Sequence, residues 1–240
     1  MNKSYIIVLR SSGTMYNDEL EKVLKNIHYE VLTFPILKIK HLYSKPIRLP
    51  SAQALLTTSS NAIQIFSELS KNRIIPIYTV GSTSKKLAKR LGFKNVIDCQ
   101  GDSGKMFKKV LKTSSKSDGS LIYVGAKNIS LDLPNMLRSE GYEVKRYIVY
   151  KTEEVKVIDE KLKNLIKLKK VKWIVLLSKR GAFNFNKLFL RSFNFSLFEK
   201  IKFACLSENI AKELNYKIKL KFFPNHPTLN LLKNVIMKNE

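Results

Sequence analysis

The stretch "LLTTSSNAIQIF", residues 55–66, decides the fold class of this 240-residue chain. An apolar run stops at four consecutive hydroxyl residues and an asparagine, after which apolar residues return at helical spacing. This order predicts a buried strand, a turn and an amphipathic helix. The stretch holds no histidine, cysteine or carboxylate, so its chemistry is that of hydroxyls and backbone groups.

The same alternation continues on both sides of this stretch. "SYIIVL" reads as a buried strand, "NDELEKVLKNI" as a helix over residues 17–27, and "YEVLTFPIL" as a strand that ends near Pro35. Further strands are expected in "AQALLTT", "IPIYTVG" and "KNVIDC", each followed by a helix. Because the strands are continuously apolar, they favour parallel sheets covered by helices.

The second half of the chain repeats the first. "LIYVGAKNISLDLPNMLRSEGYEVKRYIVY" is again strand, helix and strand, like the N-terminal unit. "WIVLLSKRGAFNFNKLF" mirrors "ALLTTSSNAIQIFSEL", "IKFACLSENIAKELNY" mirrors "PIYTVGSTSKKLAKRLGF", and "HPTLNLLKNVI" mirrors "GDSGKMFKKVLK". The matched order predicts a short unit and a long unit, both duplicated.

The repeat predicts two similar α/β domains, and the chain crosses between them twice. Residues 51–150 form one domain, and residues 1–37 join residues 173–240 in the other. Residues 38–50 and 151–172 are the connections, which we expect to act as a hinge. The N-terminal segment of the chain is therefore expected to belong to the C-terminal domain.

The composition indicates a folded protein with an unusual charge. Lys and Arg total 44 against 19 Asp and Glu, giving +25, while 44% of residues are hydrophobic. No segment reaches the roughly 18 apolar residues of a membrane span, so we expect a cytoplasmic protein without a membrane partner. Cys99 and Cys205 lack metal-like spacing, and the histidines are scattered, so neither a metal nor a disulfide framework is expected.

Several segments in order resemble the uroporphyrinogen-III synthase family, and the resemblance spans essentially the whole chain. They are "VLR", "LLTTSSNAI", "YTVGSTSKKLAKRLGF", "GYEVKRYIVYKT", "LLSKRGAFNF", "FACLSENIAKEL" and "HPTLNLL". The resemblance implies two flavodoxin-like domains with parallel sheets joined by a two-stranded linker. It also implies an enzyme that cyclises hydroxymethylbilane to uroporphyrinogen III in heme biosynthesis, and a monomer without a cofactor or nucleic-acid partner.

Helix starts after parallel strands are expected to bind the substrate. Such starts present backbone N–H groups and a positive dipole end to anions, and hydroxymethylbilane carries carboxylates. A hydroxyl at such a start can equally cap its own helix. The candidate substrate-binding residues are Arg10, Thr58, Ser59, Ser60, Asn61, Gly81, Ser82, Thr83, Ser84, Gly125, Lys127, Ser178, Lys179, Arg180, Ser207, Asn209 and Thr228.

Tyr150 in "VYKT" is the candidate catalytic residue, because it matches the family's tyrosine. A phenol can donate a hydrogen bond to the hydroxyl that leaves the substrate as water. The sequence departs from the family at "LSENIAKEL", where Ser207 replaces a glycine and Glu208 adds a negative charge.

Two other functions stay open at this stage. The charge favours a basic nucleic-acid-binding α/β protein, although no binding module is recognisable. "VGSTS" is a possible phosphate turn of a nucleotide-dependent enzyme, although the chain has neither the dinucleotide fingerprint nor a P-loop.

Overall fold

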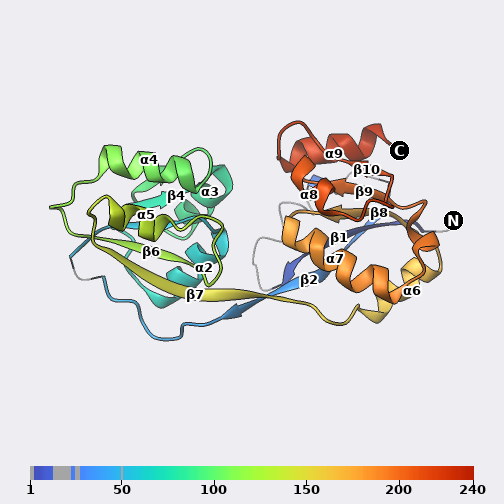
Figure 1. Cartoon of the computed structure of the whole chain (residues 1–240), viewed down its shortest axis with the longest axis horizontal. Helices are drawn as coiled ribbons and strands as arrows, with labels where there is room; N and C mark the ends of the chain where they lie inside the picture. Colours follow the sequence, from blue (N-terminus) through green and yellow to red (C-terminus); the bar gives the residue numbers. More distant parts are fainter. Residues whose placement is uncertain (1–2, 13–22, 25–27, 50) are drawn as a thin grey trace. The chain divides into compact units, whose positions relative to one another are not determined.

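A computed structural model describes residues 3–12, 23–24, 28–49 and 51–240 of the chain (Figure 1). Strands and helices alternate along it. The strands are β1 Tyr5–Ser12, β2 Glu30–His41, β3 Ala52–Thr57, β4 Ile77–Thr79, β5 Val96–Asp98, β6 Ser120–Ala126, β7 Val144–Glu154, β8 Val171–Leu176, β9 Lys202–Cys205 and β10 Lys221–Phe222. The helices are α2 Ser60–Leu69, α3 Ser82–Arg90, α4 Ser103–Thr113, α5 Leu133–Ser139, α6 Glu160–Lys167, α7 Lys179–Ser192, the 3-10 helix Phe195–Phe198, α8 Glu208–Glu213 and α9 Leu229–Lys238.

Most of the helix that the sequence predicts at residues 17–27 lies outside the described residues. Within this range only Val23 and Leu24 are described, and both are helical. Residue 50, the last of the first expected connection, also lies outside them. Within the described part of the chain, no helix has the length and apolar character needed to cross a membrane.

The chain forms two compact units. Unit 1 comprises Met1–Ile39 and Glu153–Glu240, and unit 2 comprises Lys40–Thr152. Both have the strand and helix alternation of an α/β fold with a mostly parallel sheet.

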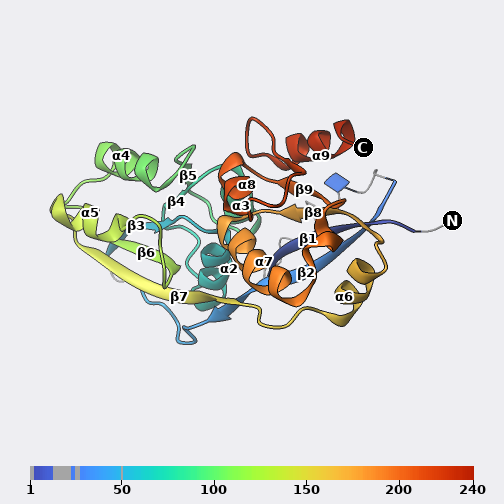
Figure 2. The ribbon, with the colours of Figure 1, turned by 45° about the vertical axis from the view of Figure 1, so that its right-hand side comes forward.

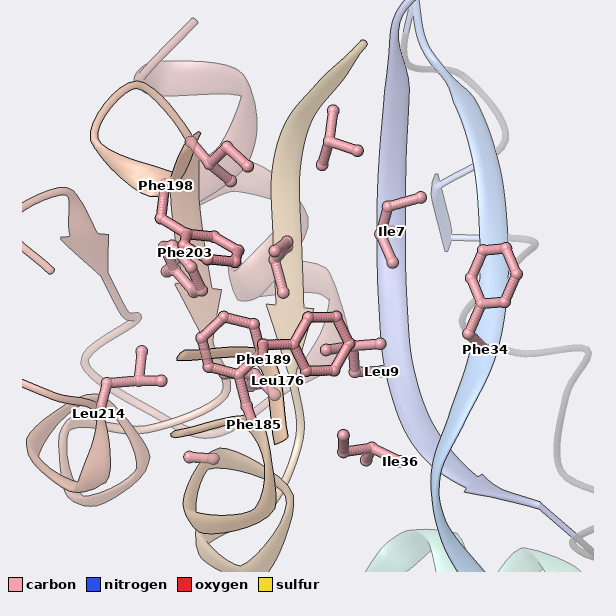
Figure 3. Packing of buried hydrophobic residues seen from close by; sticks show 14 of the residues in the cluster. Ile7, Leu9, Phe34, Ile36, Leu176, Phe185, Phe189, Phe198, Phe203 and Leu214 are labelled. Atoms are coloured by element: carbon pink, nitrogen blue, oxygen red, sulfur yellow. The ribbon is translucent and has the colours of Figure 1, made fainter. Parts of the chain in front are cut away.

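The sheet of unit 1 has the strand order β10-β9-β8-β1-β2, with all neighbours parallel. Side chains along β1 alternate between two buried clusters, because successive residues of a strand point to opposite faces. Ile7 and Leu9 join one cluster, and Ile6 and Val8 join the other. Figure 3 shows the first cluster, in which Phe185 contributes stacked and edge-on ring contacts.

Helices cover both faces of this sheet. The cluster of Ile7 takes apolar residues from α6, α7 and α8, whereas the cluster of Ile6 takes Leu232 and Ile236 from α9. Accordingly α9 lies on one face, and α6 and α7 lie on the other (Figure 1, Figure 2). Burial on both faces explains why the strands read as continuously apolar runs.

The sheet of unit 2 has the strand order β7-β6-β3-β4-β5, again with parallel neighbours. One face packs against α4 and α5 through Met106, Val110, Leu133 and Leu137. Helix α2 buries Ala62, Ile63, Ile65 and Phe66, and the Phe66 ring stacks on that of Phe93 after α3.

Strand β2 differs from the prediction, because it continues through Pro35 to His41. Proline has no N–H to donate, and it occurs in sheets at edges or irregularities. Here the pairing register with β1 shifts after the Arg10–Pro35 pair, which accommodates the missing donor. The prediction of a strand end near Pro35 is therefore wrong.

Strands β2 and β7 are hydrogen-bonded neighbours that run in opposite directions. In unit 1 the Val155 N–H donates to the Ile36 carbonyl, and in unit 2 the Leu42 N–H donates to the Val149 carbonyl. Residue numbers thus rise along one strand as they fall along the other.

The second expected connection, residues 151–172, contains a packed helix. Leu162, Leu165 and Ile166 of α6 are buried in the core of unit 1. Asp159 caps this helix by accepting hydrogen bonds from the Lys161 and Leu162 N–H groups. The charged residues between the apolar ones face outward, so the segment reads as a polar connection although one side of it is core.

Candidate functional site

A polar pocket of about 260 Å³ lies in unit 2 at the carboxyl ends of its strands. Ligands of α/β folds bind at this end of a parallel sheet. The pocket is lined by Thr58, Ser59, Ser103, Ala126, Asn128, Ile129, Ser130, Leu131 and Tyr150. It therefore combines the turn after β3, the segment after β6, the start of α4 and the candidate catalytic tyrosine.

Ser59 connects the turn to Tyr150. The Ser59 hydroxyl and the Tyr150 phenol oxygen lie 2.8 Å apart, and either group can donate the hydrogen bond. Ser59 occupies the N-cap position of α2, yet its side chain makes no capping hydrogen bond. A serine cap contributes about 1 kcal/mol to a helix. The Ser59 hydroxyl does not stabilise α2 in this way and contacts the Tyr150 phenol instead.

The position of Tyr150 is set by an irregularity in β7. The register between β6 and β7 shifts after Gly125, so that Gly125 pairs with Ile148 and Ala126 pairs with Tyr150. Val149 and Tyr150 are both buried. The Lys127 N–H donates to the Tyr150 carbonyl at 2.8 Å and holds the strand there.

Burial is the main influence on the Tyr150 phenol, which is 6% exposed. It raises the pKa of Tyr150 above the ordinary value of 10.0, because a buried phenolate loses its hydration. Hydrogen bonds from the side chains of Ser59 and Asn61 act in the opposite direction and lower the pKa. The phenol is thus protonated at neutral pH and can donate a hydrogen bond.

A second tyrosine contacts the same turn. The Thr58 hydroxyl lies 3.2 Å from the Tyr123 phenol oxygen, and Tyr123 is 1% exposed. Burial raises the pKa of Tyr123, while the hydrogen bond with Thr58 lowers it. Gly125 packs against this ring, and a Cβ atom there would lie 2.6 Å from the Tyr123 Cε1 atom. Gly125 therefore leaves room for the Tyr123 ring.

The glycine turn before α3 uses its backbone within the protein. Gly81 has φ 82° and ψ 166°, a conformation that is essentially restricted to glycine. Its N–H donates to the Asp98 carboxylate at 3.1 Å. The Ser84 hydroxyl lies 3.1 Å from that of Ser60, which joins the two turns, whereas Ser82 and Thr83 are exposed.

The candidate residues of unit 1 are placed at helix starts in the same way. Ser178 caps α7 by accepting from the Gly181 N–H at 3.0 Å, and Thr228 caps α9 by accepting from the Leu231 N–H at 3.3 Å. Ser207 begins α8 without a side-chain cap, and Glu208 after it pairs with Lys212 at 2.9 Å.

Cationic side chains were also expected near these turns. Arg10 lies in β1, beside the register shift with β2, and is half-buried. Lys179 and Arg180 open α7, directly after the Ser178 cap. Lys127 is exposed in unit 2, and the uncharged Asn209 is exposed in unit 1.

Sequence reasoning missed Ser103, Asn128 and Ser130 as pocket residues. The internal repeat marked the helix start at Ser103, because "GDSGKMFKKVLK" mirrors the segment of Thr228. Asp102 is the N-cap of α4 and accepts from the Lys105 N–H at 3.0 Å, as Thr228 caps α9. Asn128 and Ser130 lie in an irregular segment without a comparable signal.

The pocket offers neutral donors. Its polar lining consists of hydroxyls, one amide and one phenol. Among the residues that the structure describes, no group of three His, Cys, Asp or Glu side chains could hold a metal ion. The arrangement can hydrogen-bond to oxygen atoms of a ligand and can donate a proton or hydrogen bond from a buried phenol.

Comparisons with known proteins point to one family. The family described as "Uroporphyrinogen-III synthase HemD" matches residues 18–232. A search of curated protein sequences gives no match.

Two solved structures illustrate the likeness in fold. The uroporphyrinogen-III synthetase of Helicobacter pylori 26695 superposes with a TM-score of 0.62 at 18% identity, over 100% of both chains. A mutant uroporphyrinogen III synthase of the extremely thermophilic bacterium Thermus thermophilus gives a TM-score of 0.51 at 13% identity, over 97% of both chains. At such identities the likeness shows the α/β fold with its mostly parallel sheet.

Proposed function

The chain belongs to the uroporphyrinogen-III synthase family, and from this premise we propose that the pocket around Tyr150 assists the loss of water from the substrate. Enzymes of this family are cyclising lyases of tetrapyrrole and heme biosynthesis. They close linear hydroxymethylbilane to uroporphyrinogen III, with inversion of the terminal ring and release of one water molecule.

The reaction needs a hydrogen-bond donor at one atom. When the hydroxymethyl C–O bond breaks, its electron pair stays with the oxygen, which takes up a proton and leaves as water. The remaining azafulvene is attacked by the substituted carbon of the terminal ring. The resulting spiro intermediate then opens and recloses with that ring inverted. A donor beside the leaving oxygen lowers the barrier to the first step.

Tyr150 is the residue that we assign to this step. The observation that carries the assignment is its place in the polar pocket, with its phenol 2.8 Å from Ser59 and 6% exposed. Burial favours the neutral phenol, so the proton is available at physiological pH. The turn residues around it can fix the substrate so that ring closure follows one geometry.

The other candidate residues form the proposed contacts to substrate carboxylates. Hydroxyls and helix N-termini donate hydrogen bonds to anions without requiring one lysine for each carboxylate. The proposed set is Arg10, Thr58, Ser60, Gly81, Ser82, Thr83, Ser84, Lys127, Ser178, Lys179, Arg180, Ser207, Asn209 and Thr228, together with the newly found Ser103, Asn128 and Ser130. The capping bonds of Ser178 and Thr228 use one hydroxyl lone pair each and leave the O–H able to donate.

We further propose that the two units are flavodoxin-like domains with β2 and β7 as their two-stranded linker. Numbered along the chain, the strands of unit 1 follow the order 2-1-3-4-5, which is the flavodoxin order. In unit 2, β6 and β7 take the places of β1 and β2. The proposal includes a monomer that acts in the cytoplasm without a nucleic-acid partner.

Replacing Tyr150 tests the assignment. For Tyr150→Phe we expect formation of the type III product to slow by about 10²-fold, the lower range for general acid catalysis. Substrate that escapes the enzyme closes to the uninverted type I isomer, so the isomer ratio reports the defect. Tyr216→Phe is the matched control, because Tyr216 is 75% exposed in unit 1. Type III formation at the unmodified rate by Tyr150→Phe protein would remove Tyr150 from the mechanism.

A further inference from the structure

The geometry points to Ser59 as a positioning residue that directs the proton of the Tyr150 phenol away from the turn and toward a ligand. This inference rests on the proposed role of Tyr150 as hydrogen-bond donor. In this inference Ser59 orients the Tyr150 phenol. The sequence instead predicts that Ser59 contacts the substrate directly.

The first observation is the contact that Ser59 makes at the start of α2. A serine at the N-cap position ordinarily accepts a hydrogen bond from the helix backbone. The Ser59 side chain makes no such bond, and its oxygen lies 2.8 Å from the Tyr150 phenol oxygen. Ser178 and Thr228, at corresponding positions, do cap their helices.

The second observation concerns the number of protons. A phenol oxygen carries a single proton and accepts hydrogen bonds through its lone pairs. When the Ser59 hydroxyl donates in this contact, the phenol accepts through a lone pair and its own O–H is left for the ligand.

The third observation is the contrast with the neighbouring pair. Thr58 bonds to Tyr123 in the same turn, yet Tyr123 does not line the pocket. Tyr150 does line it. One turn therefore holds one phenol inside the core and one phenol at the pocket.

A titration without substrate tests the contact itself. Tyrosine labelled with ¹³C at Cζ reports each phenol by NMR, and Tyr150→Phe identifies the Tyr150 signal among the ten tyrosines. Because the Ser59 hydrogen bond lowers the pKa of Tyr150, Ser59→Ala should raise it, and Ser59→Thr should restore it. Ser67→Ala is the matched control, since the Ser67 hydroxyl donates to the Gln64 carbonyl within α2. An unchanged Tyr150 pKa in Ser59→Ala protein would overturn the inference.

A kinetic cycle then separates this inference from the proposed function. We expect Ser59→Ala to lower kcat for the type III product by about tenfold with KM within about twofold of the unmodified protein. In the Tyr150→Phe background the same change should have no further effect. An equal loss in both backgrounds would mean that Ser59 acts on the substrate directly, which contradicts the inference. A loss for Tyr150→Phe with none for Ser59→Ala would overturn the role of Ser59 and leave that of Tyr150 standing.

Discussion

At the scale of single residues, the hydroxyl groups of the helix starts have two different uses. Ser178 and Thr228 accept hydrogen bonds from their own helices. Ser59 and Thr58 instead contact the phenols of Tyr150 and Tyr123. The four residues are alike in type and in position along the sequence. What distinguishes Ser59 and Thr58 is that a tyrosine from β7 or β6 lies within hydrogen-bonding distance of the hydroxyl.

Gly125→Ala should disturb the turn through Tyr123. The added methyl would lie 2.6 Å from the ring, which is 1% exposed and has little room to move. We expect the free energy of unfolding to fall by about 1–3 kcal/mol, the usual cost of overpacking. Chemical denaturation measures it.

Tyr123→Leu provides the control for this prediction. A leucine side chain is shorter than the ring, so adding Gly125→Ala in that background should cost much less. An equal cost in both backgrounds would show that the ring of Tyr123 is not what requires Gly125.

At the scale of elements, apolar runs predict most strands and helices correctly, whereas local irregularities escape them. The strand and helix pattern around "LLTTSSNAIQIF" follows from its periodicity, and the structure has β3 and α2 there. The passage of β2 through Pro35 depends on a register shift in its neighbour. The pairing of Tyr150 with Ala126 depends on a shift between β6 and β7. Both are properties of strand pairing, which a single segment does not encode.

The end of helix α9 shows a further contact that no motif marks. Glu240 accepts hydrogen bonds from the Trp173 indole N–H at 2.6 Å and from the Tyr29 phenol. Lys202 donates to the Asn239 carbonyl and lies 5.4 Å from the Trp173 ring centroid. The side chain of Glu240 thus ties α9 to β8.

Glu240→Ala should therefore destabilise the protein. It leaves the buried Trp173 N–H without its acceptor, which costs about 1–3 kcal/mol. Trp173 is the single tryptophan, so its fluorescence during denaturation follows this site directly. Glu143→Ala is the control, because the exposed Glu143–Lys145 pair at 3.1 Å should contribute little. Equal stability of the two variants would contradict the role of Glu240.

The same contact predicts a dependence on pH. The hydrogen bond to Glu240 raises the pKa of Tyr29 from 10.0 to about 12. A raised pKa in the folded state means that the stabilisation is complete below the unfolded value and is lost as the pH rises toward 12. Glu240→Ala protein should lack this part of the alkaline loss. An alkaline loss of the same size in both proteins would contradict the contact.

At the scale of the whole molecule, duplication and charge are the two features that composition and repeats already indicate. The repeat predicts that the short units are exchanged between the two domains, and this arrangement stays a prediction. The charge of +25 does not by itself distinguish an anionic substrate from nucleic acid. The family assignment favours the substrate, a polyanion whose approach a positive field accelerates.

Salt dependence tests this interpretation of the charge. We expect kcat/KM to fall as ionic strength rises above about 0.1 M, where the screening length is about 10 Å. The value of kcat should stay nearly constant. Binding to single-stranded and duplex nucleic acid should be absent at physiological salt. A constant kcat/KM, or sub-micromolar binding of nucleic acid, would contradict the interpretation.

The most direct measurement supplies freshly made hydroxymethylbilane to the protein and separates the product isomers by chromatography. Without a catalyst the substrate closes to the type I isomer, so the type III isomer requires that the enzyme holds and inverts the terminal ring. We predict that the unmodified protein yields uroporphyrinogen III faster than the spontaneous reaction yields the type I isomer. A product that contains only the type I isomer, formed at the spontaneous rate by folded protein, would contradict the assigned function.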